Sequence, residues 1–159
     1  MLIDLQDKEI RQNRESKIMK LTTKSEYSIL ALIYLARNHR EASLRGEKEG
    51  FVKTEKICSK CDIPQKYLEL LFLTLRQGGF IKTRRGTSGG CRLARPASKI
   101  NVAEIIRLMD GALAPTESVS RFFYSDTPLA KEKKIIRVFR EIRDYISNKL
   151  ENVTLADLV

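Results

Sequence analysis

Two short helical patterns, separated by a tight turn and followed by a glycine-rich hairpin, constrain the fold of this chain more than any other feature. The first helix is predicted over Thr54–Cys61, and Asp62-Ile63-Pro64 then supplies a turn and an N-terminal proline for the next helix. The second helix ends at Gly78-Gly79, where a left-handed residue is favoured. Its apolar residues recur on one face with the 3.6-residue period; they are Leu68, Leu71, Phe72 and Leu75.

Two short strands are predicted after this helix, over Phe80–Arg85 and Cys91–Arg95. Apolar residues alternate with basic ones in both strands, and Gly86-Thr87-Ser88-Gly89-Gly90 joins them. A helix-turn-helix followed by such a hairpin is the pattern of a winged helix. In that fold the second helix enters the major groove of DNA, and the hairpin, or wing, reaches neighbouring phosphates.

A further helix is predicted before this unit. It begins at Thr23, which can form a capping box with Glu26, and its apolar residues form a wide stripe. A charged loop with two glycines is predicted to follow, from His39 to Gly50. We therefore expect this helix to be central to the core.

Two more helices are predicted after the hairpin. Asn101 begins the first, which Gly111 ends, and a long basic helix follows over Leu129–Leu150. Apolar residues of the long helix recur every three or four positions, close to an a/d seam. Such a seam can pack within one chain or against a second copy, and we expect a homodimer. The predicted interface residues are Ile135, Phe139, Ile142, Ile146 and Leu150.

The sequence as a whole predicts a mainly α fold with a small β-hairpin, that is, a winged helix-turn-helix domain plus a long dimerisation helix. Residues 1–18 are interpreted as a flexible N-terminal extension, and residues 19–100 as the DNA-binding domain. Residues 101–128 form a linking helix and a sensor loop, and residues 129–159 form the dimerisation helix and C-terminal tail.

The charge of the chain favours a nucleic-acid partner. Thirty Lys and Arg against twenty Asp and Glu give a net charge of +10, which indicates a polyanion or an anionic membrane surface. From Leu70 to Ala103 the chain has seven basic residues and no acidic one. No apolar run is long enough to cross a bilayer, and the first residues contain no apolar signal core. We expect a cytoplasmic protein with double-stranded DNA and no membrane as its partner.

The second helix and the wing supply all but one of the predicted DNA contacts, the exception being Lys24. Gln65 and Lys66 lie in the first turn, which reaches base edges, and Tyr67 can bind a phosphate or stack. A carboxylate near DNA is repelled by phosphates, so we expect Glu69 to accept a hydrogen bond from cytosine or to orient a neighbouring base reader. The wing glycines permit close approach of backbone N–H groups to phosphate. The full predicted set is Lys24, Gln65, Lys66, Tyr67, Glu69, Arg76, Arg84, Arg85, Gly86, Gly89 and Gly90.

The sequence contains weaker signals for several other functions. Cys58 and Cys61 have the spacing of half a zinc site, but a second pair is absent, so core packing is favoured. Cys91 is either an apolar filler or a redox switch beside DNA. No nucleophile–base pair, metal set or cofactor motif indicates an enzyme. The main alternative is a winged helix that binds an acidic protein partner.

Several segments resemble the Rrf-type winged-helix regulators, the family of IscR and CymR. They are KLTTKSEYSILALIYLA, IPQKYLELLFLTLRQGGFIKTRRGTSGG, INVAEIIRLMDGALAP and the later VTLADL. The resemblance covers about residues 19–159. It implies a homodimeric transcription regulator that binds a roughly palindromic operator. Such a protein represses or activates by occupying its operator, and we expect a repressor. The resemblance also implies that the DNA-contact positions are Lys66, Tyr67, Glu69, Arg76 and Arg85.

The chain departs from this family in its sensor loop. Cluster-binding members carry three cysteines there, whereas this chain has Ser118, Asp126 and Ala130, and no cysteine follows Cys91. An iron–sulfur cluster needs thiolates, so the resemblance points to the cluster-free, CymR-like branch, with no cofactor and no metal. We hypothesise that a small-molecule effector or a partner enzyme acts at this loop, through Arg121, Phe122, Phe123 and Tyr124.

Overall fold

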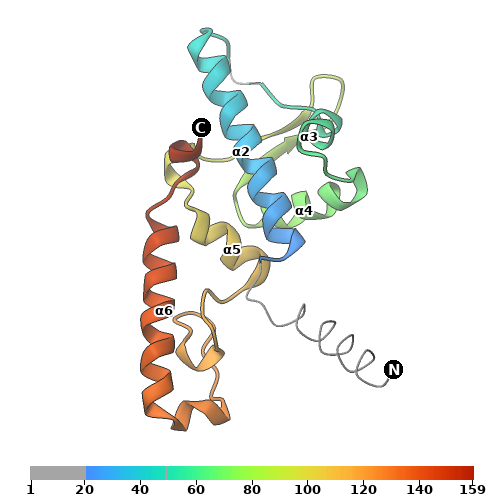
Figure 1. Ribbon diagram of the computed structural model, residues 1–159. Helices are drawn as coiled ribbons and strands as arrows, with labels where there is room; N and C mark the ends of the chain where they lie inside the picture. Colours follow the sequence, from blue (N-terminus) through green and yellow to red (C-terminus); the bar gives the residue numbers. More distant parts are fainter. Residues whose placement is uncertain (1–20, 49) are drawn as a thin grey trace, which may run out of the picture.

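The computed structural model describes residues 21–48 and 50–159 (Figure 1). The N-terminal extension predicted over residues 1–18 lies outside the described residues. The described chain is mainly helical with one two-stranded antiparallel hairpin, which confirms the predicted fold class. Its helices are α2 (Thr23–Leu44), α3 (Thr54–Cys61), α4 (Gln65–Gln77), α5 (Val102–Asp110) and α6 (Lys133–Glu151), and its strands are β1 (Ile81–Arg84) and β2 (Gly90–Leu93).

Helix α2 is the central element, and α3, α4 and α5 pack against it (Figure 1). The predicted cap at Thr23 was wrong by one residue: the side chain of Thr22 accepts the capping hydrogen bond from Ser25 N–H at 3.4 Å. The predicted start of the loop at His39 was also wrong. Residues 39–44 contain good helix formers and the buried Ala42, so the helix continues to Leu44.

The helix-turn-helix forms as the sequence indicates. Asp62 ends α3 in the left-handed region with φ 54°, and Pro64 lies immediately before α4. A conformation with positive φ is tolerated by Asp because its short polar side chain can bond locally. The turn therefore sets the two helices at the angle that brings their buried faces together. The side chains that fix this packing are Ile57, Ile63, Leu68 and Leu75, each at most 3% exposed.

The wing is shorter than predicted. Pairing runs from Ile81 opposite Leu93 to Arg84 opposite Gly90, so Phe80, Arg85 and the residues after Leu93 fall outside the ladder. Val52 extends the hairpin by a single-residue antiparallel bridge on the other side of β2. Its N–H donates to Cys91 O and its C=O accepts from Cys91 N–H, both at 2.8 Å. The wing is thereby tied to the segment that leads into α3.

The C-terminal helices differ from prediction in one boundary. Asn101 caps α5 by accepting a hydrogen bond from Glu104 N–H at 2.9 Å, and Gly111 ends the helix with φ 88°, as predicted. The long helix begins later than the predicted Leu129, because residues 128–131 form a 3₁₀ turn. The short 3₁₀ segments are η1 (Ala97–Lys99), η2 (Glu117–Val119), η3 (Pro128–Lys131) and η4 (Leu155–Leu158).

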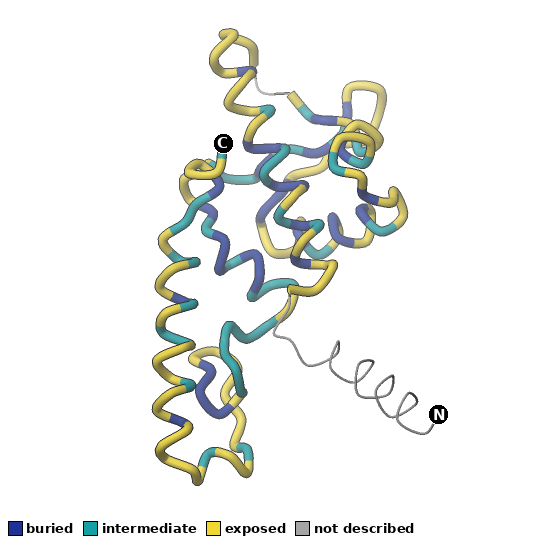
Figure 2. The backbone as a smooth tube through the Cα atoms, in the orientation of Figure 1, coloured by how far each residue is buried: buried dark blue, intermediate teal, exposed yellow. Residues whose placement is uncertain are grey.

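Burial is concentrated in the winged helix rather than in α6. Figure 2 shows buried residues along α2, α4, α5 and the hairpin, whereas α6 is mostly exposed or half-buried. Only Ile136 and Ser147 of α6 are buried. The η4 turn returns to α2 and η1, and buries Leu155 completely. Among the described helices, none has the length and apolar character that crossing a bilayer requires.

Candidate nucleic-acid interface

The first turns of α4 present polar side chains to solvent. Gln65, Lys66 and Glu69 are exposed, whereas Tyr67 is half-buried. Tyr67 packs edge-to-face on Tyr27 of α2, with ring centroids 5.5 Å apart and ring planes at 89°. Because this contact joins α4 to the central helix, it fixes the orientation of the exposed turn. The three exposed side chains are accessible to a partner, and base reading by them stays a prediction.

Glu69 has a partner on its own helix. Its carboxylate oxygen Oε1 accepts a hydrogen bond from Gln65 Nε2 at 3.1 Å, across one turn. The bond leaves the carbonyl oxygen of the Gln65 amide available to a base edge. This geometry supports the second of the two predicted roles for Glu69, orientation of a neighbouring base reader.

Arg84 and Arg85 of the wing differ in their surroundings. The Arg84 guanidinium donates to the carbonyl of Ser88 at 2.7 Å and lies 4.4 Å from the centre of the Phe51 ring. These contacts hold the wing tip closed. Arg85 is exposed and makes no hydrogen bond or ion pair with the described residues. Of the two predicted minor-groove residues, Arg85 is therefore the one that can reach DNA without opening the wing.

The wing glycines also divide into two kinds. A Cβ added at Gly89 would overlap the Arg84 carbonyl oxygen, and one added at Gly90 would overlap the carbonyl oxygen of Val52. The N–H of Gly89 donates to Gly86 O at 3.0 Å and so is not available to a phosphate. Close packing within the wing thus accounts for Gly89 and Gly90. Gly86, with φ 99° and open space around it, is the glycine that can approach a phosphate.

Lys53 was missed by sequence reasoning. Its ammonium donates to the carbonyl oxygen of Gly86 at 3.0 Å and so links the start of α3 to the wing tip. Phe51 makes a second link, since its ring lies between Arg84 and Arg92. The partners are more than thirty positions apart in the sequence, so no local pattern could reveal these contacts.

The remaining predicted DNA contacts, Arg76 and Lys24, lie on α4 and on α2. Arg76 is exposed near the C-terminal end and lines a shallow depression together with Lys82 and Arg84. Lys24 is exposed at the start of α2 and shares a groove with Tyr67. Arg95, by contrast, pairs with Glu104 at 2.7 Å and covers the Phe80 ring, so it does not contribute to the free basic surface.

Comparison with known proteins identifies the family of the chain. The family model described as Rrf2, iron-dependent transcriptional regulator, matches residues 21–159. The chain belongs to the Rrf2 family. It is 32% identical over 140 residues to the helix-turn-helix transcriptional regulator CymR of Bacillus subtilis, covering 88% of this chain and 89% of CymR. As a member of this family it is a DNA-binding transcription regulator.

Solved structures of Rrf2 proteins agree with this fold. The structure of B. subtilis CymR superposes with a TM-score of 0.66 at 30% identity, covering 89% of this chain and 96% of that one. The structure of T. potens IscR gives a TM-score of 0.64 at 29% identity, covering 88% and 85% of the two chains. Membership in this family favours regulation over catalysis.

The family description names iron dependence, and the residues of this Rrf2 protein do not fit the three-cysteine cluster site of the cluster-binding members. Ser118 of the loop after α5 is buried, and its hydroxyl contacts those of Thr116 and Thr127 at 3.3 and 3.1 Å. The three cysteines of the chain lie elsewhere: Cys58 and Cys61 on α3 and Cys91 on β2. Within residues 21–48 and 50–159, no three His, Cys, Asp or Glu side chains are grouped to hold a metal ion.

Burial disfavours the thiolate form of all three cysteines. Complete burial raises the pKa of the Cys91 thiol to about 12, and partial burial raises the pKa of Cys58 and of Cys61. A protonated thiol does not bind metal or attack an oxidant readily. The structure therefore favours the interpretation of Cys91 as an apolar filler over that of a redox switch.

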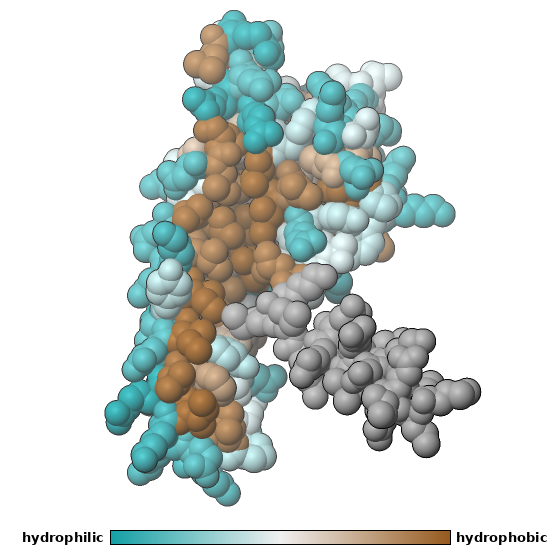
Figure 3. Space-filling view, viewed as in Figure 1, coloured by the Kyte–Doolittle hydropathy of each residue, from teal (hydrophilic) through white to brown (hydrophobic). Residues whose placement is uncertain are grey.

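The predicted dimer seam of this Rrf2 protein lies on a face of α6 that the other described residues leave partly uncovered. Ile135 and Ile142 are 36% and 38% exposed, and Phe139, Ile146 and Leu150 are half-buried. Figure 3 shows hydrophobic residues gathered in a band that extends from α2 across α5 and along α6. Ile146 and Leu150 also line an apolar hollow of about 240 Å³ against Ile106 of α5.

The predicted sensor loop lies beside α6 and carries exposed aromatic side chains. Phe122, Phe123 and Tyr124 are 67%, 47% and 64% exposed. Arg121 forms an ion pair with Asp144 of α6 at 2.7 Å, and Arg107 of α5 lies 4.7 Å from the centre of the Phe122 ring. The loop is therefore attached to both C-terminal helices.

Proposed function

We propose that this protein is a homodimeric repressor that binds a palindromic operator and carries no conventional iron–sulfur cluster. One observation carries the proposal. The exposed side chains of α4 and the wing include four basic residues with neither an ion pair nor a hydrogen bond to the described residues, beside the bonded pair Gln65 and Glu69. The four are Lys66, Arg76, Lys82 and Arg85. Backbone phosphates supply the missing counter-charge, and the Gln65–Glu69 pair reads bases.

The uncovered seam of α6 supports the dimer. Helix α6 spans 19 residues, or about 28 Å at 1.5 Å per residue, which is long enough to hold several layers of paired side chains. Pairing two copies about this seam relates two α4 helices by a two-fold axis. Each copy then reads one half of an inverted repeat, with half-sites about one helical turn apart.

The absence of cysteines from the sensor loop supports cluster-free regulation. The exposed aromatic side chains of the loop would instead bind an effector or a partner enzyme, and Arg121 and Arg107 would pass the change to α6 and α5. Substitution of Phe122 or Phe123 should change the response to the inducer more than the basal DNA affinity. Protein purified without oxygen should show no visible iron–sulfur absorption.

A gel shift with genomic fragments and random duplexes tests the proposal. We expect selective retention of promoter fragments by the native chain and weaker retention of all duplexes by Arg85→Ala. The alternative, a winged-helix module for an acidic protein, predicts no preference among duplexes at any salt concentration. A clear preference for one fragment over random DNA would therefore exclude it.

A further inference from the structure

A cavity of about 300 Å³ lies behind the wing, between the C-terminal half of α2, the following loop and the start of α3. Its floor is apolar and consists of the buried side chains of Leu35, Ala42, Val52 and Leu93. Its rim is basic, with Arg45, Lys48, Lys53, Lys56 and Arg92. An apolar floor with convergent polar groups is the usual form of a small-molecule site.

The rim carries more positive charge than its own acids neutralise. Glu47 is the one carboxylate among the described lining residues, and Arg45 binds it in a bidentate pair at 2.8 and 3.1 Å. That pair lowers the pKa of Glu47, which therefore stays ionised. Lys53 is not counted, because its ammonium binds Gly86 O outside the cavity. The other four basic residues outnumber the acidic ones by four to two, even with Glu49 of the same loop, which lies outside the described residues. Like charges gathered at one cavity favour an anion there.

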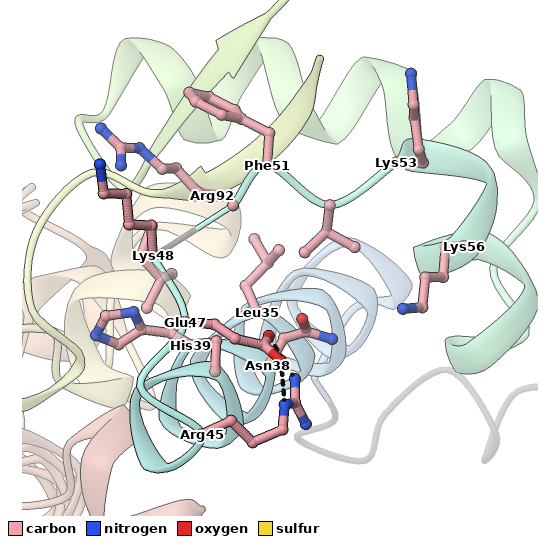
Figure 4. A pocket seen from close by; sticks show the side chains of 14 residues that line it. Leu35, Asn38, His39, Arg45, Glu47, Lys48, Phe51, Lys53, Lys56 and Arg92 are labelled. Carbon is pink, nitrogen blue, oxygen red and sulfur yellow. Dashed lines mark hydrogen bonds and ion pairs between the residues drawn. The ribbon is translucent and has the colours of Figure 1, made fainter. Parts of the chain in front are cut away.

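Figure 4 shows how these side chains are arranged. Lys48 and Arg92 lie next to each other on one side, with their charged ends at the outer edge of the cavity, and the ammonium of Lys56 is directed inward from the opposite side. Arg45 and Glu47 form their ion pair on a third side. Lys53 is directed away from the cavity, in agreement with its bond to Gly86 O at 3.0 Å.

We propose that this cavity binds a small organic anion, a phosphate or carboxylate attached to a short apolar group. Binding of this anion lowers the affinity of the wing for DNA. The anionic group would lie between Lys56 on one side and Lys48 and Arg92 on the other, and the apolar group on the floor. A DNA phosphate has no apolar group to cover Leu35 and Val52, so the geometry favours a free metabolite over the operator backbone.

Three contacts connect the cavity to the wing. Val52 is hydrogen-bonded to Cys91 of β2, Lys53 binds Gly86 O at the wing tip, and Phe51 lies between Arg92 and Arg84, 4.9 and 4.4 Å from their guanidinium carbons. An anion that draws Arg92 into the cavity loosens the stack on Phe51, and with it the contact that holds Arg84. This effect on DNA rests on the proposed function, whereas binding of the anion does not.

Phenyl phosphate is the test ligand, titrated calorimetrically into DNA-free protein at constant ionic strength, with inorganic phosphate as the comparison. We expect phenyl phosphate to bind about tenfold more tightly than inorganic phosphate, because its ring covers the floor. The double variant Lys48→Gln/Lys56→Gln should bind phenyl phosphate at least about tenfold more weakly than the native chain does. Its control, Lys99→Gln/Lys131→Gln, removes two exposed charges away from the cavity and should bind like the native chain.

Operator binding with and without saturating phenyl phosphate tests the coupling. We expect about a fivefold loss of DNA affinity in the native chain and no change in the cavity double variant. Equal phenyl phosphate binding by all variants, or none by the native chain, would overturn the site even if DNA binds normally. If phenyl phosphate binds but no duplex does, the proposed function fails and the site stands. If the cavity variant alone loses DNA affinity without ligand, its lysines contact the operator and the proposal is wrong.

Discussion

Arg85→Ala should reduce the salt dependence of DNA binding by a predictable amount. Lys66, Arg76, Lys82 and Arg85 are exposed on α4 and the wing and form no ion pair with the described residues. If each neutralises one phosphate, a dimer neutralises about eight, and the logarithm of the binding constant falls with the logarithm of salt concentration at a slope of about −7. Removing Arg85 from both copies removes about two phosphate contacts, so the slope should become shallower by about 1.8.

The assay is fluorescence anisotropy with a labelled operator and a labelled random duplex, repeated over a series of potassium chloride concentrations. The slope should change equally for both duplexes, because a phosphate contact carries no sequence information. Arg40→Ala is a matched control, since Arg40 is exposed on α2 outside α4 and the wing. It should leave the slope unchanged.

Two results would refute this reasoning. A slope that Arg85→Ala does not alter would show that Arg85 contacts no phosphate. A slope near zero for the native chain would remove the electrostatic basis of binding altogether. Arg84→Ala is expected to behave differently from Arg85→Ala, because the bond to Ser88 O and the stack on Phe51 close the wing tip. It should also lower the free energy of unfolding.

Three further predictions follow from other parts of the molecule. Glu69→Ala should reduce discrimination at one base pair by about 1–3 kcal/mol and leave random-DNA affinity equal or higher; an equal loss on every operator variant would contradict the orienting role. Ile142→Asp should convert the dimer to a monomer in analytical ultracentrifugation with its helical circular dichroism retained, because Ile142 lies on the uncovered seam of α6. Cys91 should resist a thiol reagent at pH 8 until the chain unfolds, since it is buried and its pKa is raised to about 12; rapid labelling in the native state would show that the wing opens.

Local patterns predicted the helix-turn-helix and the wing because each depends on residues that are close in sequence. Asp62-Ile63-Pro64 specifies the turn, Gly78-Gly79 ends α4, and the Asn101 cap begins α5. The predicted loop at His39 failed for a reason of the same kind. A charged segment without a breaker before Gly46 remains helical when Ala42 can be buried.

The contacts that hold the wing could not be predicted, because they join distant segments. Lys53 and Phe51 precede α3, whereas their partners Gly86, Arg84 and Arg92 belong to the hairpin. The number of basic residues in this part of the sequence also overestimates the number of basic side chains that are available to DNA. The sequence does not distinguish Arg84 and Arg95 from Arg85. In the structure, Arg84 closes the wing tip through its bond to Ser88 O, and Arg95 pairs with Glu104.

The central claim is that two copies of α4 and its wing read an inverted repeat. Selection of bound duplexes from a random-sequence library tests it most directly. We predict that the enriched duplexes share two inverted half-sites whose centres lie about 34 Å apart, one helical turn, or a multiple of it. Enrichment of a single unpaired half-site, or of no sequence at all, would contradict the claim.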